Sequence, residues 1–214
     1  CDYDAYFKEM EEMKEKYKGQ ITLKTGIEFG IQVHTTKAYE ETFGQYPFDF
    51  VIFSCHQVEN KEYWRQEPQK GKTQLEYNRR YYQEILDVVK AYKDYSILGH
   101  LDVIKRYDLN GEIKLEKIKD LIEQIFEVVI ADGKGIELNT SSRAYHLKSL
   151  MPSRKILELY HDMGGKIITI GSDAHNADRV GDRVMESQKI LKEIGFNGIY
   201  TFDQMKPKFH EFKF

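Results

Sequence analysis

The chain has 214 residues, of which 41% are hydrophobic and 31% charged, and its formal net charge is −3. This length suffices for a substantial core, and we expect a single domain over residues 1–214. The charge is slightly negative and no basic block stands out, which argues against nucleic acid as a partner. No apolar run approaches the roughly 20 residues that cross a bilayer, so we expect no membrane partner either.

The start of the chain, Cys1 to Asp4, has neither the basic region nor the apolar stretch of a signal peptide. The cysteines are Cys1 and Cys55. Two cysteines in a chain without secretory features indicate reduced thiols rather than a disulfide framework. We therefore expect a cytoplasmic protein in which Cys55 is a small, buried apolar residue.

Helical and extended periodicities alternate along the chain, with no linker rich in proline or glycine between them. Apolar residues at helical spacing predict helices over 2–18, 35–43, 73–93 and 114–131, one opening after Pro152, and one over 182–194. Apolar runs predict strands over 21–28, 49–55, 95–101, 135–139, 166–171 and 198–202. Six strands interleaved with helices indicate an α/β fold with a parallel sheet, whose closed form is a β/α barrel.

Acidic residues, histidines and one asparagine lie where these strands end. They are Glu28, His56, His100, Asp102, Glu137, Asn139, Asp173 and His175. In βα-repeating folds the carboxyl ends of the strands meet at one mouth, where barrel enzymes keep their chemistry. Imidazole nitrogens mixed with carboxylate oxygens suit Zn, Mn or Fe, and a pair of such ions can activate water and hold a phosphoryl group.

Two arginines occupy parallel positions just beyond strands that lead to this mouth. Arg106 lies six residues after His100, and Arg143 lies six residues after Glu137. The guanidinium fork matches phosphate oxygens in geometry and stays charged at any working pH. These two side chains are therefore our candidates for binding a phosphate together.

Five short motifs carry a resemblance to a known family. They are Gly26-Ile27-Glu28, Ser54-Cys55-His56, Gly99-His100-Leu101-Asp102, Glu137-Leu138-Asn139-Thr140-Ser141 and Gly171-Ser172-Asp173-Ala174-His175. In this order they resemble the motifs of the PHP metal-dependent phosphoesterases, and within them most closely those of the histidinol-phosphate phosphatases. The resemblance implies a distorted seven-stranded (β/α)7 barrel.

The same resemblance implies roles for the site residues. Glu28 would bridge two divalent metal ions, His56 and His100 would bind one of them, Asp173 the other, and His175 a third. Glu28, Asp173 and His175 would be the catalytic residues, and Arg106 and Arg143 would hold the substrate phosphate. Two or three ions of Zn, Mn or Fe are implied as cofactors. The implied reaction is hydrolysis of the small molecule L-histidinol phosphate to L-histidinol, a step of histidine biosynthesis.

The chain departs from the family at its start, because the family carries an earlier His-x-His segment, a further ligand soon after it, and a histidine closing its second strand. The remaining histidines here are His34, His146, His161 and His210, and no two of them form a His-x-His pair. We therefore expect an N-terminally incomplete barrel lacking about two βα units, with the missing segment or a partner covering the gap. The alternative is a truncated, non-catalytic remnant that retains partial metal or phosphate binding.

A single histidine or glutamate at a strand end is more often part of a hydrogen-bonded structure than a ligand. The combination favours metal binding for Glu28, His56, His100, Asp173 and His175. For Asp102, Glu137 and Asn139, orienting the ligands and holding loops remain equally open roles. His34 is interpreted as a structural cap or a surface residue.

Overall fold

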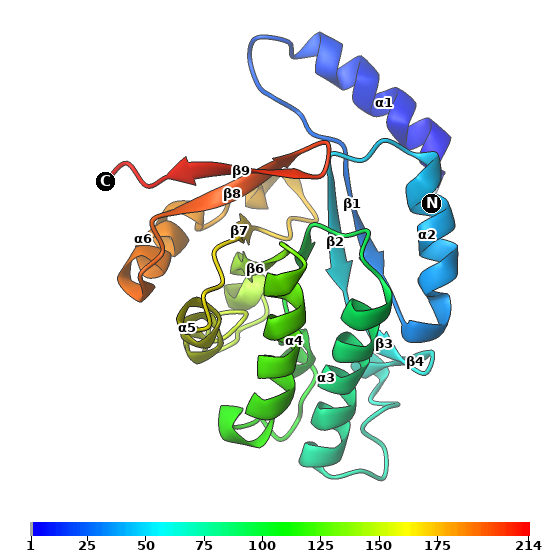
Figure 1. The fold of residues 1–214 in the computed structure, drawn as a ribbon, viewed down its shortest axis with the longest axis vertical. Coiled ribbons are helices and arrows are strands. Elements are labelled where there is room, and N and C mark those ends of the chain that lie inside the picture. The colour runs from blue at the N-terminus through cyan, green and yellow to red at the C-terminus, as the bar shows by residue number, and fades with distance from the viewer. Residues whose placement is uncertain (1) are drawn as a thin grey trace.

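Five parallel strands form the central sheet of the computed structural model, which describes residues 2–214 (Figure 1). In their order across the sheet they are β1 (Gly26–Gly30), β2 (Phe50–Ser54), β5 (Ile97–Leu98), β6 (Gly135–Asn139) and β7 (Ile168–Gly171). Two small antiparallel hairpins are β3 (Gln57–Val58) with β4 (Lys61–Glu62), and β8 (Gly198–Asp203) with β9 (Lys206–Glu211). The predicted α/β fold with a parallel sheet is thereby confirmed.

Helices connect the parallel strands. The α-helices are α1 (Tyr3–Lys16), α2 (Thr36–Gln45), α3 (Gln74–Ala91), α4 (Lys119–Ala131), α5 (Arg154–Asp162) and α6 (Val184–Ile194). The short 3-10 helices are η1 (Val33–Thr35), η2 (Tyr63–Arg65), η3 (Val103–Arg106), η4 (Leu115–Lys117), η5 (Thr140–Arg143) and η6 (Ala177–Arg179). Among the helices of residues 2–214, none combines the length and the apolar character that a bilayer span requires.

Helix α3 shows how the sequence builds the layer beside the sheet. Thr73 caps its first turn in a capping box with Glu76, which satisfies backbone donors that the helix leaves free. The tyrosines on its inner face, among them Tyr77 and Tyr81, are buried in the core, and α3 packs against α4 (Figure 1). Cys55 is also buried, as predicted, and is a free cysteine.

The first strand lies further along the chain than predicted. Residues 21–25 belong to no strand, although the Thr25 carbonyl accepts the Asp49 amide at 2.8 Å, and the ladder with β2 begins at the pair Gly26 and Phe50. At this end the backbone amide of Thr25 donates to the side chain of Asp49, at 2.9 Å, instead of to a neighbouring strand. As a consequence, Glu28 lies in the middle of β1, beside Ile52 of β2, and not beyond its end.

The prediction of a sixth parallel strand over 198–202 is wrong, because β8 pairs antiparallel with β9 in a separate sheet. Gln204 and Met205 both have positive φ, of 49° and 63°, which is the backbone of a two-residue hairpin turn. This turn usually shows itself in a sequence as Asn-Gly or Asp-Gly. Here neither residue is glycine, and all of β9 is exposed, so neither turn chemistry nor burial pattern indicated the hairpin.

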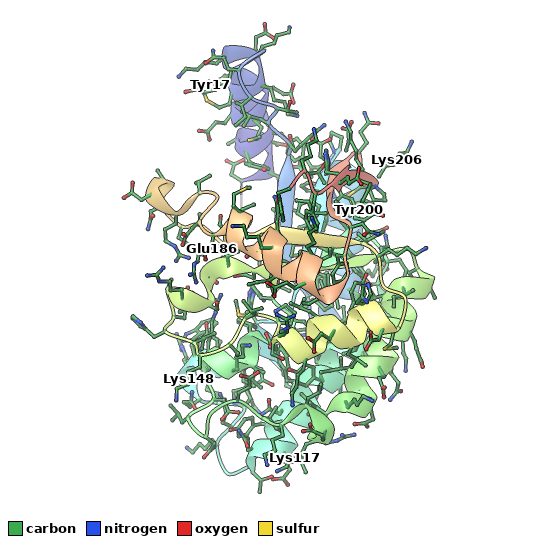
Figure 2. The ribbon with its side chains drawn as sticks, turned by 90° about the vertical axis from the view of Figure 1, so that its left-hand side faces the viewer. Tyr17, Lys117, Lys148, Glu186, Tyr200 and Lys206 are labelled. Carbon is green, nitrogen blue, oxygen red and sulfur yellow. The ribbon has the colours of Figure 1, made fainter. Side chains whose placement is uncertain are left out.

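The outer part of the N-terminal helix stands clear of the sheet. Figure 2 shows α1 projecting from the body of the molecule, with Tyr17 on the segment that follows it. Its first turns are the attached part, because Phe7 stacks on Tyr46 with ring centroids 5.0 Å apart. Strands β1 and β2 end on the opposite side of the sheet from α1 (Figure 1), and the candidate site lies toward that end.

Candidate metal centre

Three neighbouring parallel strands place one glutamate and two histidines together. Glu28 lies on β1, His56 follows β2 by two residues, and His100 follows β5 by two residues. The register joins Glu28 to Ile52, and Ile52 to Ile97, so the three strands run side by side at one level. Because parallel strands end at the same edge, side chains some 70 positions apart in the sequence meet there.

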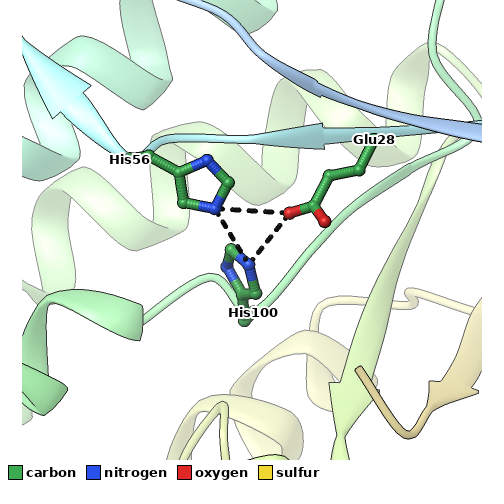
Figure 3. Close-up of side chains that lie close together, drawn as sticks. All are labelled: Glu28, His56 and His100. Atoms are coloured by element: carbon green, nitrogen blue, oxygen red, sulfur yellow. Dashed lines mark hydrogen bonds and ion pairs between the residues drawn. The ribbon is translucent and has the colours of Figure 1, made fainter. Parts of the chain in front are cut away.

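The three ligand atoms form a nearly equilateral triangle, drawn in Figure 3. Glu28 Oε1 lies 3.1 Å from His100 Nε2 and 3.3 Å from His56 Nε2, and the two Nε2 atoms are 3.3 Å apart. Among residues 2–214 this is the group of histidine, cysteine and acidic side chains arranged closely enough to hold a metal ion. It is therefore the candidate metal centre.

Hydrogen bonds alone do not satisfy this triangle. An Nε2 atom carries at most one proton, and an ionised carboxylate carries none. If both histidines donate to Glu28, their two N–H groups oppose each other across 3.3 Å, and if either Nε2 is unprotonated, its lone pair faces the carboxylate oxygen. A cation resolves the conflict, and a tetrahedral zinc site with ligands at about 2.0–2.1 Å requires donor separations of about 3.3 Å. The donor set thus fits a transition-metal ion.

The site lies partly buried, and its charges are coupled. The His100 side chain is 4% exposed, whereas those of His56 and Glu28 are 41% and 37% exposed. Burial by itself raises the pKa of Glu28, but the hydrogen bonds from His100 and His56 outweigh it and hold that pKa far below its usual range. Burial by itself lowers the pKa of His100, but the hydrogen bond to Glu28 and the charges of Glu137 and Glu28 raise it overall.

A pH dependence of metal uptake follows from the raised pKa of His100. A metal ion must displace the proton that His100 holds, so affinity should increase with pH through and above about 6.5, the ordinary histidine value. We expect the apparent affinity for Zn²⁺, measured by competition with a chromophoric chelator from pH 5.5 to 8.5, to rise as protons are released. An affinity that is flat across this range would exclude His100 as a ligand.

Glu137 and Asn139 form hydrogen bonds that hold the backbone of His100. Glu137 Oε2 accepts the backbone amide of His100 at 2.9 Å and the side-chain amide of Asn139 at 3.1 Å. Burial raises the pKa of Glu137, and the nearby His100 opposes that shift. Glu137 therefore fixes the backbone that carries His100, while neither residue contributes a ligand atom to the triangle. Asp102, the third residue with an open role, turns away to Lys105, at 2.8 Å.

Asp173 and His175 lie outside the triangle. Asp173 follows β7 with a φ of 49°, and its Oδ2 accepts from Arg106 Nη2 at 3.0 Å and from Ser141 Oγ at 3.2 Å. The His175 side chain is 79% exposed, and its Nδ1 lies 3.1 Å from the backbone oxygen of Asp173. The structure therefore gathers three of the five predicted metal ligands into one group and leaves this pair after β7, which β6 separates from β5.

The two candidate phosphate ligands differ in their surroundings. The Arg106 side chain is 7% exposed, donates to Asp173 and Ser141, and keeps a buried Nε without a partner among residues 2–214. Arg143 is exposed and lines a cavity of about 660 Å³ together with His146, Lys148 and Arg183. His34, interpreted as a cap or surface residue, is exposed and pairs with Asn60.

Two residues beside Arg106 were missed from the sequence. Tyr145 places its ring 3.9 Å from the Arg106 guanidinium, in a cation–π contact. Lys105 is buried against Asp102. The sequence gives only a weak indication of them, namely their closeness to the candidate phosphate ligands: Lys105 precedes Arg106, and Tyr145 follows Arg143 by two residues. Neither contact has a periodicity that would reveal it in advance.

The family model of the PHP domain matches residues 1–141 of the chain. The histidinol-phosphatase of Lactococcus lactis is 30% identical over 211 residues, which cover 94% of this chain and 76% of that protein. A probable histidinol-phosphatase of Clostridium acetobutylicum is 26% identical over 203 residues, covering 93% of this chain and 76% of the relative.

Solved structures show the same fold. The crystal structure of the Lactococcus lactis histidinol phosphate phosphatase, complexed with zinc, L-histidinol and phosphate, matches with a TM-score of 0.86 and 28% identity. The match covers 97% of this chain and 80% of that one. A putative histidinol phosphatase from Listeria monocytogenes matches with a TM-score of 0.66 at 17% identity, covering 86% of this chain and 75% of that one.

Proposed function

Since the chain belongs to the PHP domain family, among its histidinol-phosphatases, we propose that it hydrolyses L-histidinol phosphate to L-histidinol and phosphate. In this reaction a water oxygen bonds to phosphorus while the bond from phosphorus to the histidinol oxygen breaks, and that oxygen takes up a proton. The observation that carries the proposal is the triangle of Glu28, His56 and His100, whose spacing and donor types fit a metal ion.

We propose that this triangle holds one divalent ion, of Zn, Mn or Fe, with Glu28 placed to reach a second. Asp173 and His175 would supply ligand atoms for the further ions. They follow the carboxyl end of β7, which belongs to the same parallel sheet. When bound, such ions lower the pKa of water and neutralise the charge that develops on phosphoryl oxygens. Glu137 keeps His100 in place through its backbone amide, so the ligand geometry is fixed in advance.

Arg106 and Arg143 would bind the phosphate of the substrate. The unpartnered Nε of Arg106 supports this role, because a buried donor without an acceptor is costly unless a ligand supplies one. Both arginines keep their charge at any working pH and can orient the phosphorus for attack from one side. We further infer that the sheet belongs to the distorted barrel of the family. In support, the triangle joins three adjacent parallel strands, with Glu28 on β1 and the two histidines just after the carboxyl ends of β2 and β5.

Metal removal and return tests the proposal. We expect the protein treated with a chelator to release no phosphate from L-histidinol phosphate, and the addition of Zn²⁺ or Mn²⁺ to restore turnover together with metal bound to the protein. L-histidinol phosphate should be hydrolysed with a higher kcat/KM than an aryl phosphate. Bound metal without phosphate release from either ester would instead establish the non-catalytic remnant.

A further inference from the structure

The segment 141–150 carries Arg143 and Tyr145, and two adjacent side chains of η3 hold its two ends. Arg106 donates to Ser141 at the start of the segment and stacks on Tyr145 in its middle. Lys105 Nζ donates to Ser149 Oγ at 3.0 Å and to the backbone oxygen of Leu150 at its end. The segment is therefore a loop closed by neighbouring residues of the β5 exit.

Lys105 can hold the end of this loop because a buried carboxylate holds Lys105. Its Nζ lies 2.8 Å from Asp102 Oδ2, and the two side chains are 5% and 4% exposed. The same Oδ2 accepts the backbone amide of Ser153 at 2.9 Å, just beyond the loop. A long lysine side chain so enclosed keeps little rotamer freedom, so its hydrogen bonds fix the loop end closely.

The residue after the loop is also hydrogen-bonded to β6, the strand next to β5. The backbone amide of Asn139, on β6, donates to the backbone oxygen of Met151 at 2.7 Å. The side chain of Asn139 accepts from the Ser141 amide and donates to Glu137, which holds His100. Lys105 therefore bonds to Leu150, and the next residue, Met151, bonds to Asn139, whose side chain leads through Glu137 to the backbone of His100.

We propose that Lys105, paired with Asp102, is a positioning residue that sets loop 141–150, and with it Arg143 and Tyr145, for binding the phosphate group of the substrate. This inference rests on the proposed function of the same site. The hydrogen bonds and ion pairs of Lys105 join it to Asp102, Glu112 and the loop end, not to the candidate metal ligands or Arg143, so we expect its effect to pass through the loop. Loss of Lys105 should weaken binding of the phosphate group equally in the substrate complex and in the transition state. Such a uniform loss raises KM and leaves kcat nearly unchanged.

The test uses two variants, because removing one partner of a buried ion pair strongly destabilises a protein, while neutralising both partners is often tolerated. Lys105→Met removes the loop contacts, and Asp102→Asn combined with Lys105→Met also removes the buried charge of Asp102. The other carboxylate near Lys105, Glu112 at 3.7 Å, is 40% exposed and remains solvated. We expect both variants to raise KM for L-histidinol phosphate by about tenfold or more, with zinc content unchanged. Lys105→Arg should recover part of the lost affinity. Lys155→Met, at a lysine that is 71% exposed, is the matched control and should behave as the unaltered protein.

Calorimetric titration of the zinc-loaded protein with inorganic phosphate separates this inference from the proposed function, because binding needs no turnover. A weaker phosphate affinity in both variants upholds the positioning role even if no ester is hydrolysed. The inference is overturned if the double variant regains affinity together with its melting temperature, or if kcat falls at constant KM. Loss of zinc in parallel with the lost affinity, or an unaltered protein that binds no phosphate, overturns it equally.

Discussion

Replacing His100 with Asn is expected to abolish zinc binding at the triangle and to lower kcat/KM for L-histidinol phosphate by at least about 10³-fold. The asparagine has no atom at the position of Nε2, which lies 3.1 Å from Glu28 Oε1 and 3.3 Å from His56 Nε2. A metal ion contributes several kcal/mol of charge stabilisation to the transition state, and about 1.4 kcal/mol corresponds to each factor of ten. Metal content per chain and phosphate release measure the two effects together.

Two further histidine variants make this result decisive. His100 is buried, so its replacement can disturb folding, whereas the half-exposed His56 offers the same loss of a ligand atom with less risk to the core. His56→Asn should therefore show the same loss of zinc and activity with a melting temperature close to that of the unaltered protein. His34→Asn, at an exposed histidine bonded to Asn60, should retain both. If His56→Asn keeps its zinc and its turnover, the triangle does not hold the catalytic metal.

The residues of the candidate metal centre could be predicted from the sequence, because parallel strands bring residues that are distant in the sequence to one edge of the sheet. A short apolar run followed by a histidine recurs before His56 and His100, and the order of strands brings those exits together. Glu28 was found for a different structural reason than expected, since it points from the middle of β1 and not from its end. The residue type was informative even where the strand boundary was not.

The neighbourhood of Arg106 shows what the sequence could not predict. Its contacts with Ser141, Tyr145 and Asp173 join the exits of three different strands. Such contacts depend on the paths of irregular loops. Loops lack the periods of two or 3.6 residues that show which side chains of a strand or helix share a face. The β8–β9 hairpin was not predicted for a related reason. Its turn residues, Gln204 and Met205, have positive φ but are not the glycine or asparagine that normally indicates it. The candidate metal ligands on and just after the strands were thus more predictable than the loop that carries Arg143, the other candidate phosphate ligand.

Replacing Arg106 with Ala is expected to lower kcat/KM for L-histidinol phosphate by about 10²–10³-fold, with metal still bound at the triangle. This range is typical for removal of one preorganised donor that stabilises the charge of a transition state. Arg106→Lys should recover little of the loss. The Nη2 atom of Arg106 makes both contacts, to Ser141 and Asp173, and leaves the other guanidinium nitrogens for phosphate, whereas lysine has a single nitrogen. Steady-state kinetics and metal analysis of the two variants give the comparison.

The contact between Arg106 and Asp173 raises a rival explanation, in which the arginine acts only by holding a metal ligand. The two explanations differ in their response to guanidinium ions added at a non-denaturing concentration. If Arg106 binds the phosphate, guanidinium should partly restore turnover in Arg106→Ala by occupying the vacated space, and the affinity for inorganic phosphate should recover in parallel. If Arg106 only orients Asp173, the variant should instead lose metal, and added metal ions should rescue it.

Arg79→Ala is the control. It removes an arginine whose side chain is 40% exposed and paired with Asp120 on the α3–α4 surface, and it should leave the kinetics unchanged. Full activity of Arg106→Ala would exclude both explanations, because a guanidinium that is 7% exposed between two strand exits would then serve neither substrate nor metal.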